Sequence, residues 1–166
     1  RKQVERDVLE SRNKFQTLFE NSPDVITVTD LETRVIDMNR TAPGYTKEKV
    51  VGTRYLDYLQ DENRELLENT VNQVMATGLP QQYELEVSNP DGSSSIWFSR
   101  VSPMRVDNEI IQLVINSTDV TASRVNEIAL KESESKYKSL VETASDAIYM
   151  IDSDGKIVDV NQSACD

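Results

Sequence analysis

Residues 10–43 read ESRNKFQTLFENSPDVITVTDLETRVIDMNRTAP, and a similar run, ESESKYKSLVETASDAIYMIDSDGKIVDVNQSAC, returns at residues 132–165. Eleven of the 34 aligned positions are identical without a gap, and several of these are polar residues typical of turns. Such an ordered match indicates an internal repeat rather than shared composition. The sequence therefore predicts one complete unit and the first third of a second. We expect the chain to be part of a longer tandem protein.

The composition around this repeat suits a folded, acidic domain. The chain has 166 residues, of which 37% are hydrophobic and 28% charged, so it has enough apolar material for one core. Its net charge of −11 disfavours binding to nucleic acid or to an anionic membrane surface. No apolar run approaches the ~20 residues that span a bilayer, and no signal peptide is expected. We expect a cytoplasmic location, with a parent protein that could be membrane-anchored.

The rare residue types limit the chemistry further. The chain has no histidine, which excludes Ser-His-Asp triads, Cys-His dyads, histidine-ligated haem and most zinc catalysis. Its one cysteine, Cys165, allows no internal disulfide and no cysteine-cluster metal site, which suits a reducing compartment. Carboxylates gather at Asp57, Asp61 and Glu62, where helix capping by Asp61 explains them without catalysis. The sequence therefore predicts no catalytic residue and no metal ligand.

Periodicity predicts the order of the elements. Residues 1–20 form a helix, Val25–Thr29 and Arg34–Met38 a hairpin, residues 46–51 and 54–59 short helices, and residues from Asp61 to near Gly78 a longer helix. Three strands follow at Gln82–Val87, Ser95–Met104 and Glu109–Thr118, with a turn at residues 89–92, and residues 121–142 form a connecting helix. This order predicts an α+β fold in which a five-stranded antiparallel sheet carries helices on one face. Residues 143–166 would form a two-stranded hairpin, expected to be disordered or ordered only by pairing with another chain.

Both flanking helices carry a heptad stripe. Val4, Val8, Phe15 and Leu18 share the first stripe, and Leu130, Tyr137 and Leu140 belong to the second. The stripe could lie on the domain's own sheet, or it could pair two chains as a coiled coil. We favour the second interpretation, a homodimer in which Val4, Val8, Phe15 and Leu18 pack across a two-fold axis.

An ordered set of short motifs resembles the PAS domain family. The set comprises Phe15 to Ile26, Asp30, Arg34 to Asn39, Gly44 to Gly52, Asp91-Gly92 ahead of Trp97, and the closing Asp119-Val120-Thr121. The resemblance covers residues 12–122 as a complete domain and residues 143–166 as the truncated start of a second. It implies a sensory module, and tandem copies joined by helices most resemble sensor histidine kinases of prokaryotic two-component phosphorelays. Diguanylate cyclases and chemotaxis-type receptors share this arrangement.

The resemblance also allows each known PAS cofactor to be compared with the residues that it requires. A flavin-cysteinyl photoadduct and a cysteine-linked chromophore both need a cysteine that residues 12–122 lack, and Tyr55 falls near the photoadduct position. Non-covalent flavin stays open but without support. Only four residues, 40–43, separate Asn39 from Gly44, about one helical turn fewer than in most PAS sequences, and Pro43 would end a helix there. The remaining possibilities are that the domain binds a small organic ligand or that it binds no ligand.

A PAS ligand would lie between the inner face of the sheet and the helices. The candidate cavity residues are Ile26, Val28, Ile36, Met38, Tyr55, Tyr58, Met75, Tyr83, Leu85, Trp97, Ser99, Arg100, Leu113 and Ile115. The alternative is that they are ordinary core, in a domain that only dimerises. Arg100 would select a carboxylate if it pointed inward, whereas an outward position would leave it solvated.

The closing motif is the expected point of signal transfer. Asp119, Val120 and Thr121 lie where the last strand gives way to the connecting helix. The carboxylate could accept hydrogen bonds from free N–H groups of that helix, or it could pair with Arg34 or Arg100.

Overall fold

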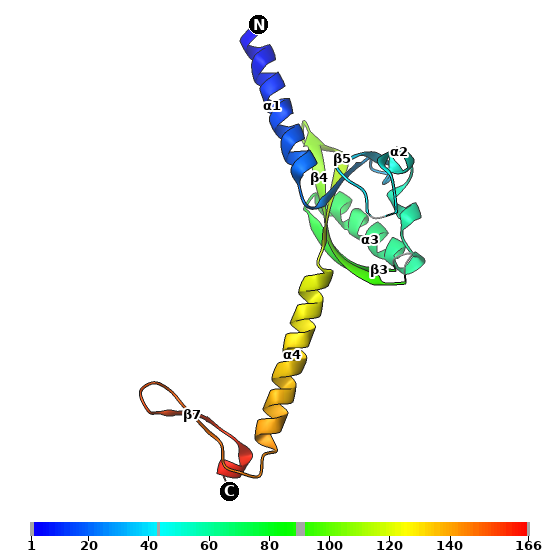
Figure 1. The fold of residues 1–166 in the computed structure, drawn as a ribbon. Coiled ribbons are helices and arrows are strands. Elements are labelled where there is room, and N and C mark those ends of the chain that lie inside the picture. The colour runs from blue at the N-terminus through cyan, green and yellow to red at the C-terminus, as the bar shows by residue number, and fades with distance from the viewer. Residues whose placement is uncertain (1, 43, 89–91, 166) are drawn as a thin grey trace. The chain divides into compact units, whose positions relative to one another are not determined.

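A computed structural model describes residues 2–42, 44–88 and 92–165. The chain divides into two units, one ending at Thr121 and the other beginning at Ala122. The first unit contains α1 (Lys2–Asn21), β1 (Val25–Thr29), β2 (Val35–Met38), α2 (Lys47–Val50), the 3-10 helix η1 (Tyr55–Tyr58), α3 (Asp61–Thr77), β3 (Gln81–Ser88), β4 (Ser94–Val106) and β5 (Glu109–Asp119) (Figure 1). The second contains most of α4 (Thr121–Glu142), then β6 (Tyr149–Ile151), β7 (Ile157–Val160) and a 3-10 turn, η2 (Gln162–Ala164).

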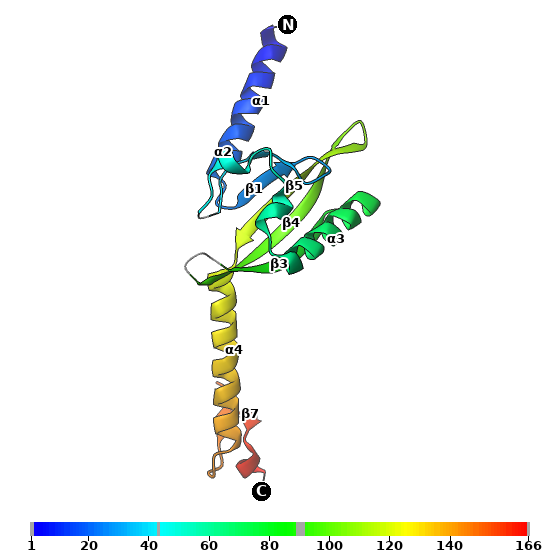
Figure 2. The same cartoon turned by 90° about the vertical axis from the view of Figure 1, so that its right-hand side faces the viewer.

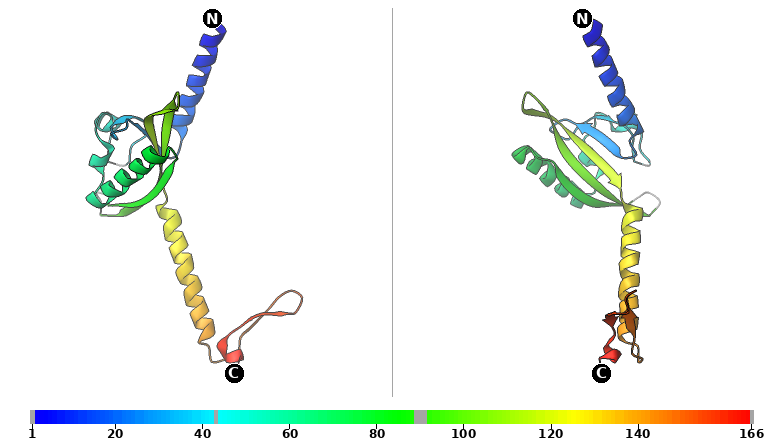
Figure 3. Two further views of the ribbon diagram at one scale, coloured as in Figure 1. Left: turned by 180° about the vertical axis from the view of Figure 1, so that it is seen from behind. Right: turned by 90° about the vertical axis from the view of Figure 1, so that its left-hand side faces the viewer.

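The five strands of the first unit form one antiparallel sheet in the order β2-β1-β5-β4-β3. The helices α2, η1 and α3 lie on one face of it (Figure 2), and in the right-hand view of Figure 3 the strands lie in front of α3. This confirms the predicted α+β architecture. The expected turn at 89–92 lies, apart from Gly92, outside the described residues, as does Pro43.

One half of the inner sheet face is filled by α3. Leu67 and Val74 of this helix are fully buried against Val101, Leu113 and Ile115 of the two longest strands. An apolar stripe on α3 and alternating apolar residues on the strands produce this core, because each element buries one side. The other half of the inner face is therefore left for the cavity described below.

The pairing of β1 with β2 contains a bulge. Val28 pairs with Asp37 and Thr29 with Val35, so Ile36 has no partner across the ladder. An extra residue in one strand breaks the alternation of its side chains. Ile36 is consequently 44% exposed.

The start of α3 differs from the prediction that Asp61 caps the helix. The N-cap residue is Gln60, which makes no side-chain capping bond, and Asp61 lies one position inside the helix. There it faces Arg64 at 3.6 Å and sits in the first turn, where a negative charge interacts favourably with the helix dipole. At the other end Gly78 adopts the left-handed conformation (φ 66°) and donates its N–H to the Val74 carbonyl.

The second unit consists of a helix and a hairpin. The strands β6 and β7 pair with each other, and the apolar side chains Tyr149, Met150, Ile151, Ile157 and Val158 are exposed. The expectation that residues 143–166 are ordered only by pairing with another chain, or are disordered, stays a prediction. None of the described helices combines the length and the apolarity needed to cross a membrane.

Candidate ligand cavity and its junction with the connecting helix

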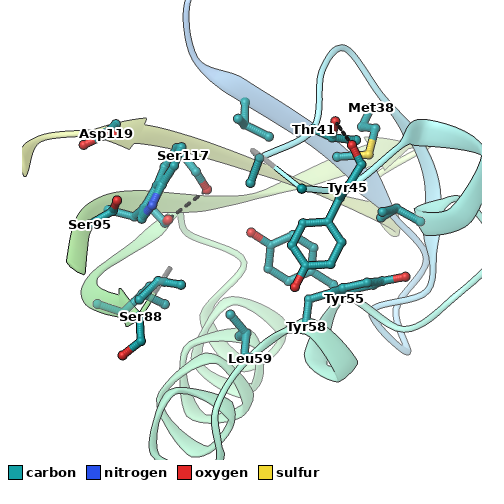
Figure 4. Close-up of a pocket in the computed structure, with 18 residues that line it drawn as sticks. Met38, Thr41, Tyr45, Tyr55, Tyr58, Leu59, Ser88, Ser95, Ser117 and Asp119 are labelled. Carbon is teal, nitrogen blue, oxygen red and sulfur yellow. Dashed lines mark hydrogen bonds between the residues drawn. The ribbon is translucent and has the colours of Figure 1, made fainter. Parts of the chain in front are cut away.

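A cavity of about 460 Å³ occupies the half of the inner sheet face that α3 leaves open. It is bounded by the sheet, by the segment before α2 and by η1 (Figure 4). The lining residues are Val25, Met38, Thr41, Ala42, Gly44, Tyr45, Val50, Tyr55, Tyr58, Leu59, Leu85, Val87, Ser88, Ser95, Trp97, Ser99, Ser117 and Asp119. The lining is mostly apolar and aromatic with a few hydroxyl groups, which is the usual composition of a small-molecule site.

The pairing of β3, β4 and β5 places the lining residues of these three strands next to one another. Leu85 pairs with Trp97 and Trp97 with Asp119, so these three side chains form one row across β3, β4 and β5. Ser99 pairs with Ser117 in the adjacent row, and their hydroxyl oxygens are 2.8 Å apart. Polar residues from two strands therefore meet on a face that is otherwise apolar.

Two tyrosines add hydroxyl groups beside this pair of serines. Burial raises the pKa of Tyr55, and the Ser117 hydroxyl beside it lowers that pKa. Burial also raises the pKa of Tyr83 far above its usual value, with Tyr55 nearby as a second cause. The buried hydroxyl of Tyr83 lies near the hydroxyl groups of Ser99 and Tyr55 but makes no well-aligned hydrogen bond to a described residue. Both phenols are therefore neutral at physiological pH.

The opposite wall of the cavity is aromatic. Tyr45 and Tyr58 pack edge to face with their ring centroids 5.1 Å apart, and Figure 4 shows Tyr55 beside them. The Tyr58 hydroxyl lies 2.8 Å from the Thr53 hydroxyl and donates to the Lys49 carbonyl at 3.2 Å. These bonds hold η1 against the end of α2 and so fix the wall.

Asp119 connects the cavity to the start of α4. Its Oδ1 atom accepts hydrogen bonds from the backbone N–H of Thr121 at 2.9 Å and from the Thr121 hydroxyl at 2.5 Å. The Thr121 hydroxyl in turn accepts the N–H of Ile96 at 2.8 Å, and Val120 donates its N–H to the Ile96 carbonyl. One residue of the cavity lining is thus bonded to the first residue of the connecting helix, which is itself tied to β4.

The arginines considered as alternative partners of Asp119 lie elsewhere. Arg34 donates to the Gly52 carbonyl at 2.9 Å. Arg100 is exposed, and its neighbours along β4, Ser99 and Val101, are the buried ones. Asp119 therefore acts on the helix through Thr121, and Arg100 does not point into the cavity.

Comparison with known proteins identifies the family. A model described as "PAS fold" matches residues 19–125, and a second, "PAS domain", matches residues 135–166. This chain belongs to the PAS family. The resemblance predicted from the motifs is confirmed, and the cavity described above lies within the first PAS match.

Similar proteins support this placement. The chain is 25% identical over 171 residues to Sporulation kinase E of Bacillus subtilis (strain 168), covering 99% of this chain but only 22% of that protein. The PAS domain of a Colwellia psychrerythraea protein aligns with a TM-score of 0.58 at 24% identity, over 69% of this chain and 98% of the other. The PAS domain of an HTR-like protein from Haloarcula marismortui gives 0.54 at 21% identity, over 72% and 99%. The two structures establish the fold alone.

Six of the predicted cavity residues line the PAS cavity, namely Met38, Tyr55, Tyr58, Leu85, Trp97 and Ser99. Three others, Tyr83, Leu113 and Ile115, point to the same face but are packed in the core. Leu113 and Ile115 are packed in the core with residues of α3 and are not among the lining residues of the cavity.

Five predicted residues lie away from the cavity. The inward residues of β1 are Thr27 and Thr29, which are 1% and 0% exposed, so Ile26 and Val28 point to the other face. Ile36 is the bulged residue, Met75 lies on the exposed side of α3, and Arg100 points outward. Alternation along β1 was predicted in the wrong phase, because the larger aliphatic side chains were assigned to the inner face that the two threonines occupy. Thr29 donates its hydroxyl to the Asp30 carbonyl, whereas the buried Thr27 hydroxyl has no hydrogen-bond partner among the described residues.

Several lining residues carried no prediction as cavity residues. They are Val25, Thr41, Ala42, Gly44, Tyr45, Val50, Leu59, Val87, Ser88, Ser95 and Ser117, together with Asp119, which was assigned only to signal transfer. Strand alternation could have found some of them. Every second residue of β5 points to the same face, so Ser117 and Asp119 share the face of Leu113 and Ile115. The segment from Thr41 to Tyr45 has no periodicity, so its position was not predictable.

The residues predicted to form a dimer are exposed along α1. Val4, Val8, Phe15 and Leu18 are each 62–65% exposed, and the ring of Phe15 stacks on Phe19 at 5.7 Å. The helix α4 likewise exposes Leu130, Tyr137 and Leu140. Both stripes are available for a partner.

Proposed function

We propose that this chain is the sensory PAS module of a two-component sensor histidine kinase, which binds a small organic molecule and relays binding through α4. One observation carries the proposal: Asp119 is an exposed residue of the cavity lining, and its Oδ1 atom accepts two hydrogen bonds from Thr121, the first residue of α4. Binding of a molecule in the cavity can therefore change the start of α4 through Asp119 alone, without a rearrangement of the hydrophobic core. The kinase assignment is supported by the likeness to Sporulation kinase E.

The relay would work through a change in the Asp119–Thr121 contact. A ligand shifts an equilibrium only as far as it binds one arrangement better than the other. A ligand that draws the carboxylate into the cavity weakens its two bonds to Thr121 and frees the first turn of α4. Val120 and Thr121 would transmit the change, because both are bonded to the backbone of Ile96 in β4.

The module would act as a cytoplasmic homodimer within a tandem PAS array. The apolar stripes of α1 and α4 suit parallel coiled coils, in which a change at one end alters helix register at the other. Val4, Val8, Phe15 and Leu18 would meet their mates across the two-fold axis. The same module could serve a diguanylate cyclase or a chemotaxis-type receptor, since PAS signalling helices feed several output domains.

The competing function is a ligand-free dimerisation module, which the same exposed stripes favour. Mass spectra of the 166-residue chain under native and denaturing conditions separate the two. We expect an added small-molecule mass in the native spectrum only, and its loss in Ala42→Phe, which fills the cavity from its lining. Ala76→Phe on the exposed surface of α3 is the matched control and should keep the added mass. A native dimer with twice the denatured chain mass and no added mass would support the ligand-free alternative.

A further inference from the structure

We infer that the cavity selects a small organic cation, an amine with an apolar body, over neutral and anionic molecules of the same shape. The inference rests on the proposed function, because it requires that the cavity binds a ligand. It follows from the charge, the hydrogen-bonding capacity and the aromatic surface of the lining.

Charge is distributed very unevenly in the lining. Among the described lining residues, Asp119 is the only one with an ionisable acidic or basic group other than the tyrosine phenols. No described lining residue is basic, and two basic side chains outside the lining lie away from it: Lys47 pairs with Asp37 at 2.6 Å, and Arg100 points outward. An anion entering the cavity would lose its hydration without gaining a basic partner, which is costly.

Asp119 retains capacity for a ligand. Both of its hydrogen bonds to Thr121 are made by Oδ1, while no described residue bonds to Oδ2. An ionised carboxylate accepts about four hydrogen bonds over its two oxygens. An ammonium group can therefore donate to Asp119, and charge-assisted bonds of this kind are stronger than neutral ones.

The remaining surface suits the body of an amine. Trp97 lies in the same row as Asp119, and Tyr45, Tyr55 and Tyr58 form the far wall. Aromatic faces carry negative potential, so they attract cations and repel anions. The net charge of −11 adds a long-range attraction for cations approaching the domain.

This selectivity would connect ligand charge to the helix start. An ammonium group that bonds to Oδ2 would draw the carboxylate toward the cavity and so weaken the two bonds that Oδ1 accepts from Thr121. A neutral molecule of the same shape fills the cavity but leaves this contact unchanged. The ligand's charge, rather than its volume, would then determine the response.

Three probes of matched shape test the inference: 2-phenylethylamine, 2-phenylethanol and phenylacetate, titrated calorimetrically into the full 166-residue chain. For the wild type we expect the amine to bind about three- to tenfold more tightly than the alcohol, and phenylacetate to bind more weakly than both. In Asp119→Asn, which keeps an oxygen acceptor for Thr121, the amine should lose this advantage while the alcohol binds as before. Asp57→Asn removes an equal charge from an exposed residue outside the lining and should keep the preference.

The possible failures can be told apart. Alcohol or phenylacetate binding as tightly as the amine, or a preference unchanged in Asp119→Asn, would overturn the inference. If amine selectivity is absent but Ala42→Phe abolishes binding of the alcohol, the cavity binds ligands, and the proposed function stands without the inference about charge. If no probe binds at millimolar concentration and no mass is retained in the native spectrum, both are wrong.

Discussion

Asn39 and Asn161 make the same three hydrogen bonds at equivalent positions of the two PAS matches. The Oδ1 atom of Asn39 accepts the N–H of Ile26 at 2.8 Å, and its Nδ2 donates to the carbonyls of Phe19 and Asp24 at 3.0 and 2.9 Å. Asn161 repeats these bonds with Ile148, Val141 and Asp146 at 2.8, 3.0 and 2.9 Å. Asn39 thus ties the end of α1 to β1, and Asn161 ties the end of α4 to Ile148, the residue before β6.

Asn39→Ala should destabilise the first domain by about 2–3 kcal/mol, because it leaves four backbone groups without their side-chain partner, the fourth being the N–H of Arg40. Urea unfolding followed by circular dichroism measures this change. Asn72→Ala on the exposed surface of α3 is the control and should be nearly neutral. Equal effects of the two substitutions would show that the bonds of Asn39 contribute little.

Tyr83→Phe should be neutral or stabilise the domain by up to about 1 kcal/mol, because it removes a buried hydroxyl that makes no well-aligned hydrogen bond to a described residue. Thermal unfolding tests this, with Ser99→Ala as the contrast. Ser99→Ala removes the buried hydrogen bond between the Ser99 and Ser117 hydroxyl groups and should be destabilising. A clear loss of stability in Tyr83→Phe would mean that its hydroxyl is bonded in solution.

Stability should fall as the pH rises above about 10. Burial raises the pKa of Tyr55 and of Tyr83 above the ordinary tyrosine value of 10.0, so the unfolded chain releases these protons first. Their contribution is fully present below pH 10 and is lost progressively above it, because the unfolded state then binds fewer protons. Urea midpoints measured from neutral to alkaline pH test this, and Tyr83→Phe should flatten the alkaline decline. An equal decline in wild type and variant would contradict it.

Asp119→Ala should cost about 1 kcal/mol of stability, through loss of the bonds to Thr121, and should also uncouple stimulus from output. The measurements are the melting temperature of this chain and the output activity of the full-length parent with and without stimulus. Asp57→Ala is the charge-matched control. A variant of lower stability with a normal stimulus response would show that Asp119 is only a structural cap.

Phe15→Glu should dissociate the proposed homodimer, because it places a charge in the apolar stripe of α1, where an unpaired buried charge costs several kcal/mol. Sedimentation equilibrium measures the association. Asn13→Glu adds the same charge on the same helix outside the stripe and should leave the dimer intact. A wild-type monomer at high micromolar concentration, with its helices intact, would rule out this interface.

Periodicity predicted most of the fold. The bounds of β1 and the start of α4 match the prediction, because turn residues and helix caps act over a few positions. The bulge at Ile36 was not predictable, since it depends on how two strands pair rather than on either strand alone.

The candidate site was only partly predictable for the same reason. Trp97 and Ser99 could be placed from alternation within one strand, whereas Tyr45 depends on where an irregular segment folds back. The link from Asp119 to the cavity required the register between β4 and β5, which no local pattern contains.

The short segment between Asn39 and α2 bears on the timing of the sensor. Its described residues form no helix, yet Thr41, Ala42, Gly44 and Tyr45 border the cavity. A bound molecule could leave by displacing this segment without melting any regular structure, so opening of the cavity would require only loop motion. How long a ligand stays would then be determined by its affinity for the lining and not by the unfolding of a helix.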